Sequence, residues 1–571
     1  MSLVCKPRVF LNKALSSIRS LNSMPKRSFS DVESRDGSNS NSYESKFSAT
    51  TLFLARTASL GYILANCSLQ LPYHLRNEVM SSTKTKDEEY DIAIVGGGMV
   101  GLALACGLAS MQLTKELSVA IIDNNPALIS SEHYKKHGVP YPRVSTVTPA
   151  TLSFFKEVGA WKYIEQQRHA YFDQMQVWDY SGLGYTRYHA RDVGNEYLGC
   201  VVENMVLCDA LLSCLQQNLD FQMSIHNARI TSMKFPSPFT STTTSKEQMR
   251  LKGDSSGFAS SGYTVEPIHN GSFVKLGLSN AKNIYAKLVV GADGAKSHVR
   301  EKAGLNTTGW NYRQNAVICT VEHSVENHCA WQRFLPSGPI ALLPIGDKFS
   351  NIVWTMSPEE SLTHKTMSRD SFVMSVNFAL DYGYGSHPQS SFLDEFVHRI
   401  SSISGHGTAS MAEPFQVPPE VTDVVSERMT FPLSLMHARE YASERVVLIG
   451  DAAHAVHPLA GQGVNLGFGD AATLSKVIDE GLQVGADIGE LSLLKKYEKE
   501  RKAVNLTMMA VLDGFQKAYS MDFGPLNFLR AAAFHSCQFI APLKRNILSY
   551  AMGEQKWPLF TWETNNGERN S

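Results

Sequence analysis

The chain has 571 residues, a length that suits two or three domains with a sizeable core. Hydrophobic residues make up 43% and charged residues 19%, as in an ordinary globular protein. The formal net charge of −1 gives no overall reason to expect a nucleic-acid partner. The nine cysteines are scattered without a C-x-x-C pair or a Cys/His cluster, so idle thiols are preferred over disulfides or zinc.

Residues 1–30 have the composition of a mitochondrial transit peptide. They contain many serines, have no acidic residue before Asp31 and place apolar residues on one helical face. Their cations are Lys6, Arg8, Lys13, Arg19, Lys26 and Arg27. The alternative is a disordered basic tail. A secretory signal would need a continuous apolar stretch, which this segment lacks.

Residues 31–86 are interpreted as a linker and accessory segment, with the folded part beginning near Asp87. Positions 31–50 are polar and low in complexity. Positions 51–71 are apolar and about the length of a membrane span, but Arg56 and Asn66 interrupt them. Because a charge at mid-membrane is costly, an accessory helix or a second part of the leader is preferred over a span.

The stretch YDIAIVGGGMVGLALACG, residues 90–107, predicts a strand, a glycine turn and a helix. Ile92–Val95 form the buried strand, and the helix is expected from Leu102. The turn has the spacing G-x-G-x-x-G, set by Gly96, Gly98 and Gly101. In such a unit the first glycine makes the tight turn, the second admits a pyrophosphate and the third lets helix and strand pack closely. The helix N-terminus then attracts the pyrophosphate.

A second predicted strand, residues 117–123, ends in Asp123, 22 residues after Gly101. An acid at this spacing is placed to accept a hydrogen bond from an adenosine ribose 2′-OH. The combination of strand, glycine turn, helix and acid predicts a dinucleotide site. The alternative is an ordinary glycine-rich turn in an α/β core.

Arg143 lies just ahead of a predicted helix that Thr148-Pro149 would cap. It is placed to approach a bound cofactor, and a surface salt bridge is an equally good interpretation of this stretch alone. A strand and a helix are then predicted to meet at Glu203 and Asn204, a junction suited to capping as well as to chemistry.

Asp293-Gly294 form a second turn of functional interest. The apolar run 288–290 predicts a buried strand immediately before them. In open α/β sheets, ligands bind at the carboxyl ends of the strands, so Asp293 stands where a ligand is expected.

Two other segments flank this turn. Residues 233–262 are rich in Ser, Thr, Gly and Lys and are interpreted as a surface insertion. From Arg313 to about Phe431 short alternating strands appear, with helices expected around 372–380 and 392–400. This pattern is typical of an inserted α+β domain with helices on one side of its sheet. The strands are expected at 317–321, 340–343 and 351–355.

The third turn follows the predicted strand 446–449 and begins with Gly450-Asp451. Asp451 is suited to accept from a sugar hydroxyl. Further on, Gly461-Gln462-Gly463 precede a helix expected at about 466–478. Their consecutive N–H groups would suit a ring oxygen that becomes negative.

His454 and His457 have the separation of helical metal ligands, but no carboxylate or third histidine joins them, so packing or capping is preferred over zinc. Further along, an apolar helical stripe at 494–515, which includes Arg501 and Asn505, predicts a helix packed on the main body. Past Met521 the chain is apolar and interrupted by prolines, so it either packs on the body or touches a membrane surface.

The three turns, in this order, resemble the fingerprints of the class A flavoprotein monooxygenases over residues 90 to about 545. The runs FPLSLMHARE, VVLIGDAAHAVHPLAGQGVNLGFGDA, LLKKYEKERKAVNLTMM and APLKRNIL are similar to those of the ubiquinone-biosynthesis hydroxylases. The run AWQRFLPSGPIALLPIGD and the transit-like leader most resemble the mitochondrial ring hydroxylase of that family.

This resemblance implies non-covalently bound FAD and an α/β architecture: a Rossmann-like FAD-binding domain with an inserted α+β substrate domain, the aromatic hydroxylase fold. The implied parts are 87–312 and 432–480 for FAD, 313–431 for substrate and 481–571 for C-terminal helices.

The resemblance also implies roles for the residues of the three turns. Gly96, Gly98 and Gly101 would hold the pyrophosphate and Asp123 the adenosine ribose. Arg143 would approach the ribityl–flavin region. Asp293 and Gly294 would lie near the pyrophosphate and the path of the reductant, and Asp451 would bind a ribityl hydroxyl. The segment Pro458, Gly461, Gln462, Gly463 and Asn465 would lie against the isoalloxazine. No residue is assigned as a catalytic base.

The implied reaction is hydroxylation, through a flavin hydroperoxide, of a polyprenyl-4-hydroxybenzoate ring at C5 in ubiquinone synthesis. Molecular oxygen is a co-substrate, and electrons come from NAD(P)H or from ferredoxin with its reductase, since no second G-x-G-x-x-G is present. The implied location is peripheral, on the matrix face of the mitochondrial inner membrane, among other coenzyme Q biosynthesis proteins. The alternatives are a related monooxygenase acting on another aromatic or isoprenoid, and a non-catalytic flavin-fold subunit for assembly or lipid binding.

Overall fold

The computed structural model describes residues 88–129, 138–236, 273–388, 410, 413–521 and 524–554. The chain divides into two units, Met1–Thr85 and Lys86–Ser571, and every described residue belongs to the second. The predictions for 1–30 and 31–86, for most of 233–262 and for a helix at 392–400 therefore fall outside the described residues.

The first sheet has eight strands and a parallel centre with the order β18-β19-β11-β1-β2-β8, while β9 and β10 extend it beside β11. Parallel pairing aligns Ile92 with Val119 on one side and with Leu288 on the other. Its strands are β1 (Glu88–Val95), β2 (Val119–Asp123), β8 (Met223–Asn227), β9 (Ile230–Lys234), β10 (Val274–Leu278), β11 (Asn283–Gly291), β18 (Ala442–Ser443) and β19 (Val446–Leu448).

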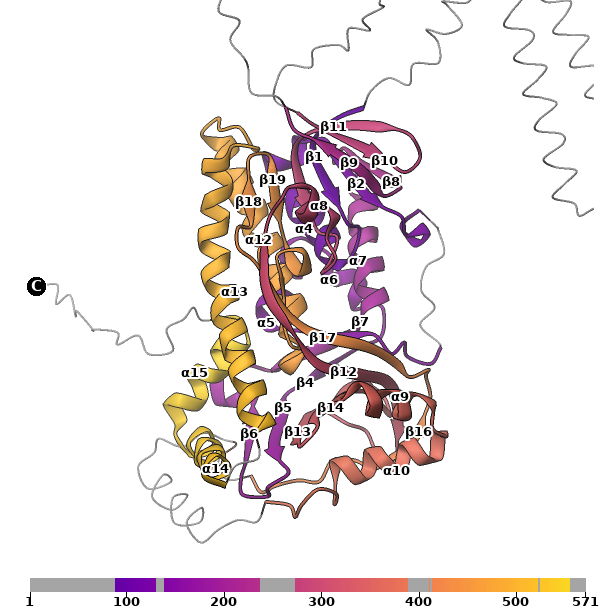
Figure 1. Ribbon diagram of the computed structural model, residues 1–571, viewed down its shortest axis with the longest axis vertical. Helices are drawn as coiled ribbons and strands as arrows, with labels where there is room; N and C mark the ends of the chain where they lie inside the picture. The colour runs from indigo at the N-terminus through magenta and orange to yellow at the C-terminus, as the bar shows by residue number, and fades with distance from the viewer. Residues whose placement is uncertain are drawn as a thin grey trace, which may run out of the picture. The chain divides into compact units, whose positions relative to one another are not determined.

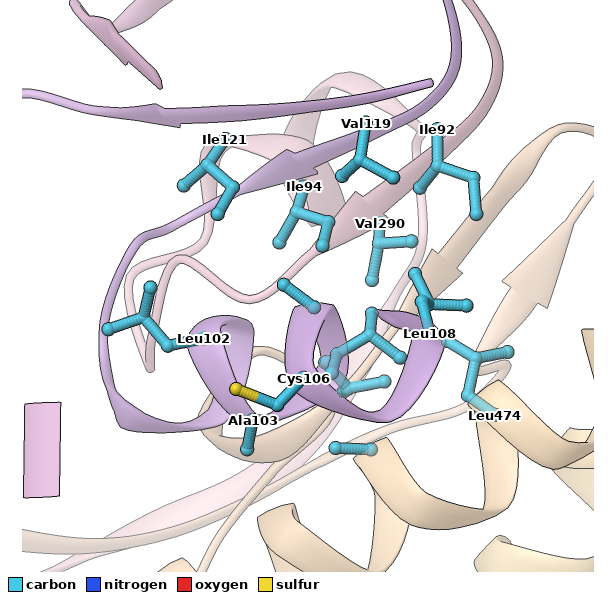
Figure 2. Packing of buried hydrophobic residues seen from close by; sticks show 14 of the residues in the cluster. Ile92, Ile94, Leu102, Ala103, Cys106, Leu108, Val119, Ile121, Val290 and Leu474 are labelled. Atoms are coloured by element: carbon cyan, nitrogen blue, oxygen red, sulfur yellow. The ribbon is translucent and has the colours of Figure 1, made fainter. Parts of the chain in front are cut away.

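The core of this half lies between the parallel strands and helix α4 (Met99–Ser110), which begins three residues before the predicted Leu102. Ile92, Ile94 and Leu102 have no exposed surface, and Figure 2 shows the strand side chains pointing onto the helix. Each such burial contributes about 1.5–3 kcal/mol. Helix α4 also packs on α7 (Asn204–Gln217) and α12 (Gln462–Gln483), so both of its faces are covered.

The second sheet has nine strands in the order β20-β17-β12-β15-β14-β13-β5-β6, with β16 beside β12. All of its neighbouring pairs are antiparallel except β13 with β5. Its strands are β5 (Gln174–Asp179), β6 (Tyr185–His189), β12 (Thr307–His323), β13 (Cys329–Leu335), β14 (Gly338–Gly346), β15 (Phe349–Met356), β16 (Val421–Val424), β17 (Met429–Ala438) and β20 (His454–Ala455).

The strands expected at 317–321, 340–343 and 351–355 lie within β12, β14 and β15, and the helix expected at 372–380 is α10 (Arg369–Leu380). Helices α9 (Pro358–Thr366) and α10 pack near β12 and β16. Strands β5 and β6 come from residues 174–189, far upstream of Arg313, so the sheet is assembled from segments distant in sequence.

A third sheet has three strands in the order β3-β7-β4. They are β3 (Val144–Val147), β4 (His169–Phe172) and β7 (Gly199–Glu203). Helices α5 (Pro149–Glu157), α6 (Trp161–Ile164) and α8 (His298–Lys302) complete the body. The C-terminal helices are α13 (Leu491–Ser520), α14 (Gly524–Phe539) and α15 (Ala541–Ala551).

In Figure 1 the first sheet occupies one end of this unit and β5, β6, β13 and β14 the other, with the long strands β12 and β17 running between them. Helix α13 runs along one side. Of its predicted stripe, Leu494, Tyr497, Met508 and Leu512 are buried, whereas Phe515 near the C-terminal end is 49% exposed. Among the described residues, no helix is both long and apolar enough to cross a membrane.

Candidate active site

The glycine turn connects β1 to α4. Its three glycines occupy a tight turn, an open stretch of backbone and a close helix contact, in that order. Gly96 has a φ of +110°, and a Cβ there would come within 2.3 Å of the Ala292 carbonyl oxygen. A Cβ at Gly101 would come within 2.0 Å of the Gly96 oxygen, so the helix packs directly on the turn. A Cβ at Gly98 would meet nothing within 4 Å, which leaves the backbone open to a ligand.

Asp123 ends β2 beside this turn. One carboxylate oxygen accepts from the Gly97 N–H at 2.7 Å and the other from the Asn125 N–H at 2.8 Å. The side chain therefore fixes the shape of the glycine turn. Its role toward an adenosine ribose stays a prediction.

The three predicted turns lie side by side at the carboxyl edge of β1, β11 and β19. The Ala292 N–H donates to the Val95 oxygen at 2.8 Å, and the Ile449 N–H donates to the Gly291 oxygen at 3.0 Å. Arg300 then donates to the Ala452 oxygen at 2.7 Å, which ties the second turn to the third. This is the edge at which open α/β sheets bind ligands.

Asp293 stands two residues beyond β11. Its Oδ2 accepts from the His298 N–H at 2.7 Å and the Val299 N–H at 3.2 Å, at the start of α8. Its Oδ1 is buried and accepts no hydrogen bond from the described residues. A buried acceptor of this kind is expected to have a partner, so the free oxygen is consistent with a ligand group near the turn.

The third turn is held from behind by Asp470 of α12. Its carboxylate accepts from the Gly450 N–H at 3.0 Å and from His454 Nε2 at 2.6 Å. It also accepts from Arg501 Nε at 2.8 Å and Asn505 Nδ2 at 3.0 Å, both on α13. Burial alone would raise the pKa of Asp470, but the charges of His454 and Arg501 outweigh it and lower the pKa to about 2.

Asp451 is exposed and lines the cavity in front of the turn. Although solvent reaches its carboxyl, the surrounding protein raises the pKa of Asp451, and nearby His454 partly opposes the shift. The side chain therefore reaches the cavity, and its role toward a ribityl hydroxyl stays a prediction.

The two histidines have different surroundings. His454 is paired with Asp470, whereas the His457 ring packs edge-on against Tyr312 with centroids 5.1 Å apart. Burial lowers the pKa of His457 to about 4, and neither ring nitrogen has a hydrogen-bond partner among the described residues. His457 lies in the cavity wall as a neutral imidazole.

The segment after Pro458 forms the start of α12. Gly461 has a φ of +62° and caps the helix without a side-chain hydrogen bond. The first N–H groups of a helix have no intrahelical acceptor, so they are the groups that can bind a ligand at such a start. Gln462 donates to the Ala551 oxygen at 3.1 Å, which connects this turn to α15. The helix start therefore presents the partial positive charge expected of it.

Asn465 has a different position from its neighbours in this segment. Its amide donates to the Thr146 and Gly461 oxygens at 2.7 and 2.9 Å, and its carbonyl accepts from Thr148 and Thr151. The side chain thus joins the start of α12 to the start of α5. It lies behind the cavity wall rather than in it.

One cavity of about 840 Å³ lies in front of these turns. Among the predicted site residues, those in its wall are Gly98, Arg143, Gly294, Asp451, Pro458, Gly461, Gln462 and Gly463. Those that stand behind the wall and brace it are Gly96, Gly101, Asp123, Asp293 and Asn465. Arg143 is exposed and lines this cavity, and its approach to a flavin stays a prediction.

The cavity continues into the second sheet, where its walls are mainly apolar. Ala341, Leu343 and Val353 come from the sheet, and Leu548 and Met552 close the wall at and just beyond α15. The polar cofactor end and the apolar end are therefore parts of one space.

Sequence reasoning missed Asp470 and the role of α15. A signal was present for the first: Arg501 and Asn505 lie on the otherwise apolar buried stripe of α13, and a buried cation requires a partner carboxylate. No local pattern distinguished Leu548 or Met552 as cavity residues, because their role depends on where α15 packs.

Comparison with known proteins agrees with this geometry. Residues 248–378 and 409–511 match the family described as FAD binding domain. The protein named "Ubiquinone biosynthesis monooxygenase COQ6, mitochondrial" of Xenopus tropicalis is 35% identical, covering 81% of this chain and 93% of the relative. The human protein of that name is 33% identical, covering 82% and 94%.

Solved structures share the fold. A p-nitrophenol 4-monooxygenase from Pseudomonas putida DLL-E4 aligns with a TM-score of 0.55 at 16% identity, covering 82% of this chain and all of that one (100%). A 2-methyl-3-hydroxypyridine-5-carboxylic acid oxygenase aligns with a TM-score of 0.51 at 15% identity, covering 83% and 99%.

The fold and the three joined turns, with these likenesses, define an FAD-dependent monooxygenase with an aromatic hydroxylase fold. The chain belongs to the family of mitochondrial ubiquinone biosynthesis monooxygenases. The residues present fit the cofactor: the backbone at Gly98 is open, Asp451 reaches the cavity, and α12 begins without a side-chain cap.

Proposed function

We propose that this protein hydroxylates C5 of the aromatic ring of a polyprenyl-4-hydroxybenzoate intermediate in ubiquinone synthesis. The observation that carries the proposal is the cavity of about 840 Å³, which extends from the three turns to an apolar chamber. A substrate with a polar ring and a long hydrocarbon tail matches that division, because the ring can reach the cofactor end while apolar walls accept the tail.

The chain's own residues are assigned binding and shaping roles. Gly98 and the start of α4 would hold the pyrophosphate, Asp451 a ribityl hydroxyl, and the N–H groups at Gly461–Gly463 the pyrimidine edge of the flavin ring. When bound, FAD supplies the activation of molecular oxygen and its transfer to the aromatic ring.

We assign the exclusion of water to the nine-stranded sheet and α15. Leu343, Val353, Leu548 and Met552 surround the chamber with hydrocarbon, which limits the access of water to the reacting atoms. The donors at the start of α12 would stabilise negative charge that develops on the flavin ring. No side chain is assigned as a base.

The partners and location follow from this chemistry. Molecular oxygen is the second substrate, and the electrons come from NAD(P)H or from ferredoxin with its reductase. A polyprenylated substrate resides in a bilayer, so we place the protein peripherally on the matrix face of the mitochondrial inner membrane, in association with other coenzyme Q biosynthesis proteins.

The test is restoration of ubiquinone in a strain that lacks this ring hydroxylation, with the products identified by mass spectrometry. The full chain is expected to restore ubiquinone and remove the unhydroxylated intermediate. An Asp451→Asn variant, which retains the size of the side chain, is expected to restore less because it binds FAD more weakly. Bound FAD without any hydroxylated product would instead favour the non-catalytic role in assembly or lipid binding. A product from a different ring would favour the related monooxygenase.

A further inference from the structure

A chain of aromatic rings connects the protein surface to the cavity. Trp310 of β12 is 47% exposed. Its ring centroid lies 6.4 Å from that of Tyr312, and the Tyr312 centroid lies 5.1 Å from that of His457. His457 is only 1% exposed and forms part of the cavity wall beside Pro458. Three rings thus lead from solvent to the cofactor end.

The middle ring is held firmly in place. The Tyr312 hydroxyl donates to Asp513 Oδ1 on α13 at 2.9 Å, and Asp513 also pairs with Lys517 at 2.8 Å. Burial and the bond to Asp513 raise the pKa of Tyr312, so its hydroxyl stays protonated. The ring therefore has a fixed orientation between its two neighbours.

The outer ring has the features of a protein-binding anchor. The Lys517 ammonium lies 4.7 Å from the Trp310 ring centroid, and Arg313, three residues further along β12, is exposed. Asp513 neutralises Lys517, so the exposed Arg313 leaves this surface with a positive charge. Exposed tryptophan flanked by arginine is typical of interface hot spots, and the charge favours an acidic partner.

We propose that Trp310, with Arg313 and Lys517, is the docking surface for an acidic protein that carries one electron, and that Tyr312 and His457 provide the packed path from that surface to FAD. The proposal rests on the proposed function, since it requires a flavin that must be reduced. It commits to a protein donor because a small reductant that enters the cavity directly needs neither an exposed anchor nor a path of rings.

The electron balance is simple. Two donor molecules each lose one electron, and bound FAD gains both together with one proton from water to become FADH⁻. The rings are neither oxidised nor reduced overall; they fill the space between donor and cofactor with tightly packed atoms. Replacing the outer ring should thus weaken docking, whereas replacing the middle ring should slow transfer without weakening docking.

The experiment uses the FAD-loaded full chain and a mitochondrial-type [2Fe–2S] ferredoxin, an acidic one-electron carrier. Binding of oxidised ferredoxin is measured by calorimetry, and anaerobic bleaching of the flavin band by reduced ferredoxin is followed by stopped flow. Trp310→Ala is expected to raise Kd by at least about tenfold, the loss typical of an interface anchor. Charge reversal by Arg313→Glu is expected to raise Kd and to flatten its dependence on salt.

Tyr312→Leu is expected to lower the limiting rate of bleaching at saturating ferredoxin with Kd unchanged, and Tyr312→Phe to retain the rate. The matched control is Tyr382→Ala, which removes another exposed aromatic ring, 66% exposed, after α10. Dithionite, which needs no docking, should bleach every variant at the same rate and thereby report that each is folded and loaded.

Unchanged Kd and bleaching rate in Trp310→Ala would overturn the proposal, as would rapid bleaching by NADPH together with none by ferredoxin. Loss of binding in Tyr382→Ala as great as in Trp310→Ala would show that the effect is not specific to this surface, and would also overturn it. Failure of the proposed function is seen separately, as absence of a flavin band or of a hydroxylated product.

Discussion

The two halves of this molecule reach stability and specificity by different means. The half built on the eight-stranded sheet, called the cofactor half, has local strand–turn–helix units. Backbone hydrogen bonds, such as that from the Ala292 N–H to the Val95 oxygen, connect their turns. The half built on the nine-stranded sheet, called the substrate half, is assembled from segments distant in sequence. Its strand β13, for example, pairs in parallel with β5. Polar geometry therefore defines the first half and apolar shape the second.

The comparison shows where small changes should matter. In the cofactor half a single buried carboxylate, Asp470, holds four donors from three elements. In the substrate half each wall residue contributes a little area to one chamber. Replacing one residue of the Asp470 network should thus destabilise the protein strongly, whereas replacing one wall residue of the chamber should have a smaller effect.

The largest expected effect is that of Asp470→Asn. An amide cannot balance the charge of Arg501 and can accept at only one of its two positions, so the third turn loses its support. Breaking a buried pair of this kind costs about 3–5 kcal/mol of unfolding free energy. Urea unfolding should show that loss, and gel filtration should show FAD separating from the protein.

Glu480→Gln is the matched control for this variant. Glu480 lies on the same helix α12 but pairs with Lys496 at the surface, where solvent screens the pair. We expect the urea midpoint and the bound FAD to stay as in the unmodified protein. Equal losses in the two variants would contradict the special position of Asp470.

A smaller effect separates folding from binding within the glycine turn. Gly101→Ala would place a methyl group 2.0 Å from the Gly96 oxygen, and overpacking of this kind costs about 1–3 kcal/mol. At Gly98, where φ is −77° and no atom lies within 4 Å, alanine fits the protein without strain. Gly98→Ala should therefore leave the stability of the cofactor-free protein unchanged and weaken FAD binding, as measured by fluorescence titration. Unchanged FAD affinity in Gly98→Ala would show that Gly98 is not a ligand position.

The cofactor half was largely predictable because its signals are short in sequence. The glycine spacing, an acid at the end of the next strand and two later strand–turn units each lie within about twenty residues, and ligands of open sheets collect at one edge. That rule placed Asp293 at the ligand edge, and the structure shows the other two turns beside it. The role of Asp470 was not predictable in the same way, since it appears only when α12 and α13 are packed together.

The substrate half was predictable as strands but not as a sheet. Alternation indicated β12, β14 and β15, whereas the partnership of β5 with β13 joins Gln174 to Cys329 and leaves no mark in either segment alone. The same holds for the aromatic path, because Tyr312 and His457 meet only through tertiary packing. Period-two patterns specify a face, and long-range register comes from the whole fold.

The two faces of β14 offer a graded test on the apolar side. Ala341 faces the cavity, whereas its neighbour Leu342 is buried in the core on the opposite face. Ala341→Phe fills part of the chamber and is expected to raise the substrate KM by roughly tenfold while the flavin band is retained. Leu342→Val should leave KM unchanged and cost about 1 kcal/mol of stability. An unchanged KM in Ala341→Phe would show that the substrate does not bind in this chamber.

The smallest effect concerns Lys544 of α15, which has no exposed surface and donates to Ser410 and Gln538. Burial lowers its pKa to about 8 from 10.5, although the nearby Asp192 opposes the shift. Between these two values the unfolded chain binds more protons than the folded one, so this lysine makes stability rise with pH from about 8 to 10.5, with no further gain above. Urea unfolding of the unmodified protein and of Lys544→Met across this range should differ by that rise, while Lys499→Met, at the surface of α13, should follow the unmodified protein. A parallel pH dependence in Lys544→Met would mean that the lysine is not buried against Ser410 and Gln538 in solution.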